Sequence, residues 1–190
     1  GYFRNKSLTS YAQGTPELMK WLHNNPRVEF QGIDIVSDHF RISLNDRVVA
    51  ILPARKIDLT GNVALHTGRG NVGGGPGQAE EFFAGALHSR GGRAVFALPS
   101  RNLQGKANIL ISAADYPNLF SNRESLDLVI TEYGIASMGS RTVRERAQAL
   151  IDIAHPADRP ELVRLAKAAH ILFPDQIYLS ESGAMYPFEI

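Results

Sequence analysis

Residues 68–98 read GRGNVGGGPGQAEEFFAGALHSRGGRAVFAL, a glycine-rich loop followed by a helical segment and an apolar strand. The loop at 68–78 has six glycines in eleven positions, and a backbone so poor in side chains can turn its amides toward an anion. The segment 78–89 ends at Gly91-Gly92, and Pro99 closes the strand at 94–98. For the loop taken alone, a mobile surface connection is the alternative interpretation.

The same alternation of apolar strands and helices continues on both sides of this stretch. Thr15-Pro16-Glu17 is typical of a helix start, and Thr142 with Glu145 has the spacing of a capping box. Asp158 and Glu161 repeat that cap pattern. The predicted strands are 48–52 and 57–59, both expected to be buried, and 108–112 and 126–131. The pattern predicts an α/β fold with a mainly parallel sheet flanked by helices.

Composition narrows the class of protein. A chain of 190 residues with 44% hydrophobic and 21% charged residues fits one globular domain. Twenty basic against nineteen acidic residues give no field that favours nucleic acid, and no apolar run suggests a membrane. Zero cysteines exclude disulfides and thiolate metal sites. With no signal-like N-terminus, we expect a cytoplasmic protein.

Two features are expected at the carboxyl edge of the sheet, where ligands of open α/β sheets bind. They are the glycine loop and Glu132, which directly follows the strand 126–131 and precedes Gly134. A carboxylate there can hydrogen-bond a ligand, act as a base or attack a carbonyl, or it can simply cap or pair. Arg101 and Lys106 follow the strand 94–98 and could meet a phosphate or a carboxylate, or lie on a solvated loop.

The sequence lacks the motifs of three other common kinds of site: metal sites, serine nucleophiles and nucleoside-triphosphate loops. The six histidines show no metal-ligand spacing, so no metal site is predicted, and each is expected to be structural, although His66 could serve as a base. Ser100, Ser112 and Ser140 lack the Gly-x-Ser-x-Gly pattern of a nucleophile elbow. The phosphate-binding loop of the common nucleoside triphosphatases is also missing.

Five ordered blocks resemble the C-terminal half of the acetyl-CoA hydrolase/transferase family, which includes acetate and 4-hydroxybutyrate CoA-transferases. The resemblance runs from about Gly14 to Leu162. The blocks are Ile57 to Val63, the loop ending Gly77-Gln78, Ser89 to Gly92 with Ala97 to Ser100, Val129 to Gly134, and Arg144 to Ala147 with Ile153 to Pro156.

The resemblance implies a CoA-transferase fold of two similar halves with the active site between them. Residues 1–190 would be the single C-terminal half, and the missing N-terminal half its partner. The implied reaction moves CoA between carboxylic acids through a glutamyl-CoA thioester, or hydrolyses acetyl-CoA. Acyl-CoA and a small carboxylic acid are then the substrates, no cofactor is needed, and a homodimer is possible. The nucleophilic glutamate would precede Gly1, so this fragment alone should be inactive.

Roles for individual residues also come from the resemblance. Glu132 would be an auxiliary carboxylate beside CoA, and the amide of Gly77, or of nearby Gly75, would stabilise an oxyanion. The sequence departs from the family pattern at Leu52, Pro76 and Asn108, and the alternative is a non-catalytic CoA-binding or docking domain. The implied CoA- or substrate-binding positions are Gly73, Gly74, Gly75, Gln78, Arg101, Lys106, Tyr133 and Gly134.

Overall fold

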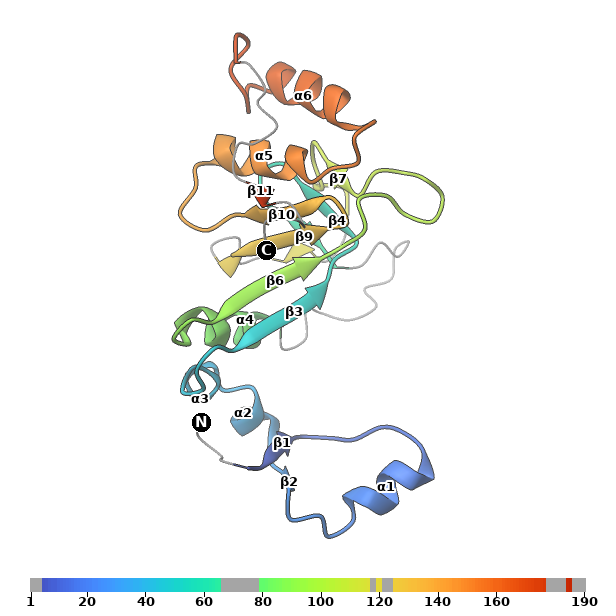
Figure 1. The fold of residues 1–190 in the computed structure, drawn as a ribbon, viewed down its shortest axis with the longest axis vertical. Coiled ribbons are helices and arrows are strands. Elements are labelled where there is room, and N and C mark those ends of the chain that lie inside the picture. The colour runs from blue at the N-terminus through green and yellow to red at the C-terminus, as the bar shows by residue number, and fades with distance from the viewer. Residues whose placement is uncertain (1–4, 66–78, 117–118, 121–124, 177–183, 186–190) are drawn as a thin grey trace. The chain divides into compact units, whose positions relative to one another are not determined.

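The computed structural model describes residues 5–65, 79–116, 119–120, 125–176 and 184–185 (Figure 1). The chain divides into two compact units, each described below by itself. Residues 1–50 with 78–93 form one unit, and residues 51–77 with 94–190 form the other. In the described part of the chain, no helix combines the length and apolarity needed to cross a membrane.

The first unit is mainly helical. Helices α3 and α4 pack together, and a Cβ added at Gly85 of α4 would lie 2.5 Å from the Ile42 Cγ2 atom of α3. Glycine at this position therefore permits the close packing of the two helices. The elements are β1 (Ser7–Thr9), α1 (Pro16–Leu22), β2 (Val28–Phe30), α2 (Ile33–Val36), α3 (His39–Ser43) and α4 (Ala79–His88).

Two larger sheets hold the remaining strands. The five-stranded sheet has the order β11-β10-β9-β6-β3, and the four-stranded sheet has the order β7-β4-β5-β8. The strands of the first sheet are β3 (Val49–Pro53), β6 (Arg93–Ala97), β9 (Leu128–Thr131), β10 (Gly134–Ser137) and β11 (Ala184–Met185). Those of the second are β4 (Lys56–Asp58), β5 (Val63–Ala64), β7 (Ile109–Leu110) and β8 (Leu119–Phe120).

Two helices accompany the sheets of the second unit. Helix α5 (Val143–Asp152) packs on β10, and α6 (Arg159–Ala168) packs on α5. The predicted capping box of α5 is confirmed, since Thr142 and Glu145 exchange hydrogen bonds. Asp158 precedes α6 but makes no side-chain cap, so that part of the prediction is wrong. Its carboxylate binds an arginine instead.

The predicted α/β class with flanking helices is confirmed, but the sheets are mixed. Strands β6 and β9 are parallel, as are β4 and β7, whereas β9 pairs with β10 and β4 with β5 in antiparallel fashion. The expectation of a mainly parallel sheet therefore needs correction. Glu132-Tyr133 alone joins β9 to β10, and a two-residue connection can only form an antiparallel hairpin.

Strand burial follows the prediction in one case and not in the other. All three residues of β4 are buried, as expected. In β3, however, Val49 is 54% and Ile51 63% exposed, and exposure alternates along the strand. Because β3 lies at the end of its sheet, an apolar run of strand length did not ensure that both faces are covered.

Candidate functional site

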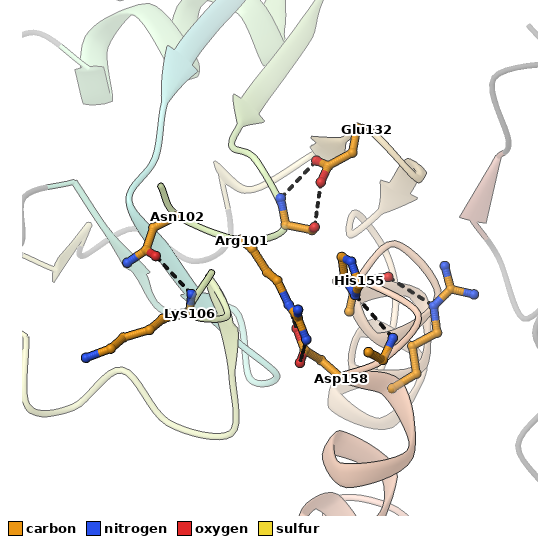
Figure 2. Close-up of polar contacts among 10 residues, drawn as sticks. Arg101, Asn102, Lys106, Glu132, His155 and Asp158 are labelled. Carbon is orange, nitrogen blue, oxygen red and sulfur yellow. Dashed lines mark hydrogen bonds and ion pairs between the residues drawn. The ribbon is translucent and has the colours of Figure 1, made fainter. Parts of the chain in front are cut away.

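Glu132 lies in the turn between β9 and β10, next to the loop that follows β6. The parallel register pairs Ala97 with Ile130, so the chain leaves both strands at the same edge of the sheet. Three residues beyond Ala97, the backbone amide of Ser100 donates to Glu132 Oε2 at 2.9 Å, and the Ser100 hydroxyl donates to Oε1 at 2.5 Å (Figure 2). One buried serine thus fixes both oxygens of the carboxylate.

These bonds favour the ionised form of Glu132. Partial burial would raise its pKa, but the hydroxyl and amide of Ser100, with a smaller contribution from the charge of His155, hold the pKa of Glu132 below its ordinary value. A carboxylate offers about four acceptor positions, and Ser100 occupies two of them. Glu132 is exposed, so the remaining positions can accept hydrogen bonds from a ligand.

The neighbouring Arg101 is held by an ion pair. Its Nε donates to Asp158 Oδ2 at 2.9 Å and its Nη2 to Asp158 Oδ1 at 2.6 Å, a two-point contact visible in Figure 2. Arg101 lowers the pKa of Asp158, mainly through these hydrogen bonds and against the effect of burial. The pair joins the loop after β6 to the start of α6.

Tyr133, the residue after Glu132, contacts one aromatic and one cationic side chain. The rings of Tyr133 and His155 meet edge to face with centroids 5.5 Å apart, and the Arg159 guanidinium lies 5.8 Å from the centroid of the Tyr133 ring. His155 Nδ1 accepts from the Ala157 amide at 3.2 Å. These contacts join the β9–β10 turn to the segment between α5 and the start of α6.

Asp58 accounts for one of the sequence blocks noted above. Its buried carboxylate accepts from the amides of Thr60, Asn62 and Ala113 and from the side chains of Thr60 and Asn62. Gly61, with φ of 94°, completes the turn in a conformation that favours glycine. The block from Ile57 to Val63 therefore builds the β4–β5 hairpin.

The predicted site residues divide into two groups. Gly73, Gly74, Gly75, Gly77 and Gln78, like Pro76, lie outside the described residues, and their roles stay predictions. The others belong to the second unit: Glu132, Tyr133 and Gly134 form the β9–β10 hairpin, and Arg101 and Lys106 lie on the loop after β6.

The structure places the described candidates in different surroundings. Gly134 is the first residue of β10 and has φ of 148°. The Arg101 guanidinium is engaged by Asp158, whereas Lys106 is exposed and its amide donates to Asn102 Oδ1 at 2.9 Å. Their assignment to CoA or substrate binding stays a prediction.

Three relevant residues were missed as site residues by sequence reasoning. Ser100 and His155 fall in the family blocks but were given no role there: Ser100 was considered as a nucleophile, His155 as one of the scattered histidines and Asp158 as a helix cap. Knowledge that β6 and β9 are parallel neighbours would have placed Ser100 beside Glu132. Within the described ranges no acidic or histidine side chains cluster closely enough to hold a metal ion. The expectation that no cofactor is needed stays a prediction.

Comparison with known proteins identifies the family of this chain. Residues 14–166 match the model of the acetyl-CoA hydrolase/transferase C-terminal domain. The chain is 36% identical to a 4-hydroxybutyrate coenzyme A transferase of Clostridium kluyveri over 160 residues, which cover 83% of this chain and 37% of that protein.

Solved structures agree with this match. RipA from Yersinia pestis has a TM-score of 0.78 at 30% identity, over 89% of this chain and 37% of that one. A 4-hydroxybutyrate CoA-transferase from Porphyromonas gingivalis has a TM-score of 0.69 at 32% identity, over 86% of this chain and 38% of that one. The chain thus spans less than two fifths of the length of these relatives. It belongs to the acetyl-CoA hydrolase/transferase family and carries that family's C-terminal domain.

Proposed function

We propose that this chain is the C-terminal half of an enzyme that transfers CoA between an acyl-CoA and a small carboxylic acid. The observation that carries the proposal is the family match over residues 14–166. The relatives compared above that are named for an activity are CoA-transferases of 4-hydroxybutyrate. The N-terminal half of the same protein would complete the active site.

In the proposed reaction, a glutamate upstream of this chain attacks the thioester carbonyl and expels CoA as its thiolate. The thiolate then attacks the glutamyl carbonyl of the resulting anhydride, releases the first acid and forms a glutamyl-CoA thioester. The carboxylate of the second acid attacks this thioester, and CoA returns to the new acyl group by the reverse steps. Hydrolysis would follow if water took the place of the second acid.

Glu132 is proposed as the auxiliary carboxylate of this site. A glutamate whose pKa lies below the ordinary 4.5 is ionised at neutral pH, so Glu132 is an acceptor there and not a proton donor, and Ser100 holds it in one orientation. An ionised, oriented carboxylate can accept a hydrogen bond from an N–H or O–H group of the bound acyl-CoA and help to position it. The Gly77 amide is proposed as the oxyanion donor, on the strength of the family resemblance alone.

The test measures CoA transfer from acetyl-CoA to butyrate by the full-length protein and by its Glu132→Gln variant. We expect wild-type transfer, and a fall in kcat/KM of about tenfold or more in the variant, because an oriented charge is removed. Glu161→Gln is the matched control, since Glu161 is an exposed glutamate that pairs with Arg164 on α6.

The outcomes separate the alternatives. Unchanged kcat/KM in Glu132→Gln would contradict the role of that residue but leave the activity intact. CoA binding without turnover in the wild-type protein would favour a non-catalytic CoA-binding domain, and lack of binding would favour a docking domain. Formation of free CoA and acetate without an acceptor acid would identify a hydrolase. A cytoplasmic location and a homodimer stay predictions from the sequence.

A further inference from the structure

A cavity of about 320 Å³ opens beside the loop after β6, whose Ser100 binds the Glu132 carboxylate. Its lining includes Pro99 and Arg101, the residues on either side of Ser100, together with Arg55, Lys56 and Asn108. Since a water molecule takes up about 30 Å³ of liquid, the cavity has room for a small organic acid but not for the whole of CoA. All of its lining residues belong to the second unit.

A buried cation lines this cavity. Lys56 is only 7% exposed, and its Nζ donates to the Ala107 carbonyl at 2.5 Å, which uses one of its three N–H groups. Burial, with a contribution from the positive charge of Lys106, lowers the pKa of Lys56. A buried charge of this kind is costly unless an opposite charge faces it.

Within the described residues, no carboxylate forms an ion pair with Lys56, Arg55 or Lys106. Arg101 differs, because its guanidinium extends to Asp158 and is neutralised there (Figure 2). Among the residues that the structure describes, the walls of the cavity supply no acidic side chain either. The cavity therefore carries positive charge that an anionic ligand would compensate.

We propose that this cavity binds the second carboxylate of a small dicarboxylic acid, a specificity that rests on the proposed CoA-transfer function. The reacting carboxylate of an acid loses its charge when it becomes a thioester. A second carboxylate stays ionised throughout, and a fixed cationic cavity can hold it from the free acid to the acyl-CoA. Lys56 and Arg55 are the recognising residues, and the neighbouring Ser100 relates the cavity to Glu132.

Binding is tested apart from turnover, by amide NMR titration of the 190-residue chain with succinate, butyrate, inorganic phosphate and adenosine 3′,5′-bisphosphate. We expect succinate to shift the amides of residues 99–108 saturably, and butyrate to bind at least about tenfold more weakly. Lys56→Met should weaken succinate binding by a similar factor, whereas Lys56→Arg retains the charge and should retain most of the affinity.

Two controls keep the result interpretable. Lys20→Met changes an exposed lysine of α1 and should leave succinate binding unchanged. Thermal unfolding of Lys56→Met without ligand should show at most a small loss of stability, because removal of a buried charge at similar volume offsets the loss of the hydrogen bond to the Ala107 carbonyl.

The proposal is overturned if butyrate binds as tightly as succinate, if only phosphate or the nucleotide shifts these amides, or if Lys56→Met retains full affinity. It is also overturned if succinate shifts nothing. Should the full-length enzyme transfer CoA although succinate fails to bind the cavity, this inference alone falls. Should succinate bind while transfer fails, the proposed function falls.

Discussion

The bond from the Ser100 hydroxyl to Glu132 can be removed without disturbing the neighbouring amide bond. Ser100→Ala should therefore raise the pKa of Glu132 toward its ordinary value, since one donor to the ionised form is lost. We expect the free energy of unfolding to fall by roughly 1 kcal/mol, a modest effect because the carboxylate is exposed. Carbon-detected NMR titration of the Glu132 carboxyl group measures the first effect, and urea unfolding the second.

Ser112→Ala is the control for this substitution, because Ser112 is exposed and its hydroxyl accepts from the nearby Ala114 amide. It should leave the pKa of Glu132 unchanged. An unaltered pKa in Ser100→Ala as well would show that the amide alone orients and ionises the carboxylate.

The ion pair between Arg101 and Asp158 is the second residue-scale test. Its side chains are 32% and 21% exposed, so it lies between a surface pair and a buried one. A double-mutant cycle with Arg101→Met and Asp158→Asn should give a coupling free energy of about 1 kcal/mol by urea unfolding. The i,i+3 pair Arg164–Glu161 on α6 is the comparison, and its more exposed side chains should couple less strongly. Equal coupling in the two pairs would contradict this ranking.

For single residues, the sequence predicted the place of a side chain in its helix or strand better than its hydrogen-bond partners. Glu132 was placed correctly at a strand end because an apolar run leads directly into it. Its contact with Ser100 spans 32 residues and depends on the register of β6 against β9, which no local pattern encodes. Asp158 shows the same limit, since a carboxylate before a helix can cap it or bind a distant arginine.

Among the elements, helix α5 offers the most direct test. Thr142 and Glu145 cap its N-terminus reciprocally, and their hydrogen bonds lower the pKa of Glu145. Thr142→Ala should lower the free energy of unfolding by about 1 kcal/mol, or the Tm by about 2–4 °C in a chain of this size. Thr142→Ser keeps the hydroxyl and should lose much less. Similar losses in both variants would point to the threonine methyl group as the important feature.

Element boundaries were predicted well where caps or breakers mark them. The helix starts at Thr15 and Thr142 and the strand end near Pro99 follow from local chemistry. Strand direction and burial were predicted less well. Apolar content identifies β9 and β3 as strands, but it cannot distinguish a hairpin from a crossover or an edge strand from a central one.

For the whole molecule, the candidate site depends on segments far apart in the sequence. Ser100, Glu132 and Asp158 come together because a parallel strand pair and the start of α6 meet in the second unit. The predicted meeting of the glycine loop with Glu132 involves residues outside the described ranges, and it stays a prediction. The sequence resemblance therefore identified the family, whereas the cationic cavity is identified by the side chains that the structure brings together.

Acid should destabilise this protein through the carboxyl groups whose pKa is lowered by folding, among them Glu132, Glu145 and Asp158. The ordinary pKa is 4.5 for the glutamates and 3.8 for the aspartate. Their contribution is present above these values and is lost as pH falls through the lower folded values, because the unfolded chain then binds more protons. Urea unfolding should show stability falling from about pH 5 to pH 3. Asp158→Asn should fall less steeply, and a flat profile in the wild-type chain would contradict the lowered pKa values.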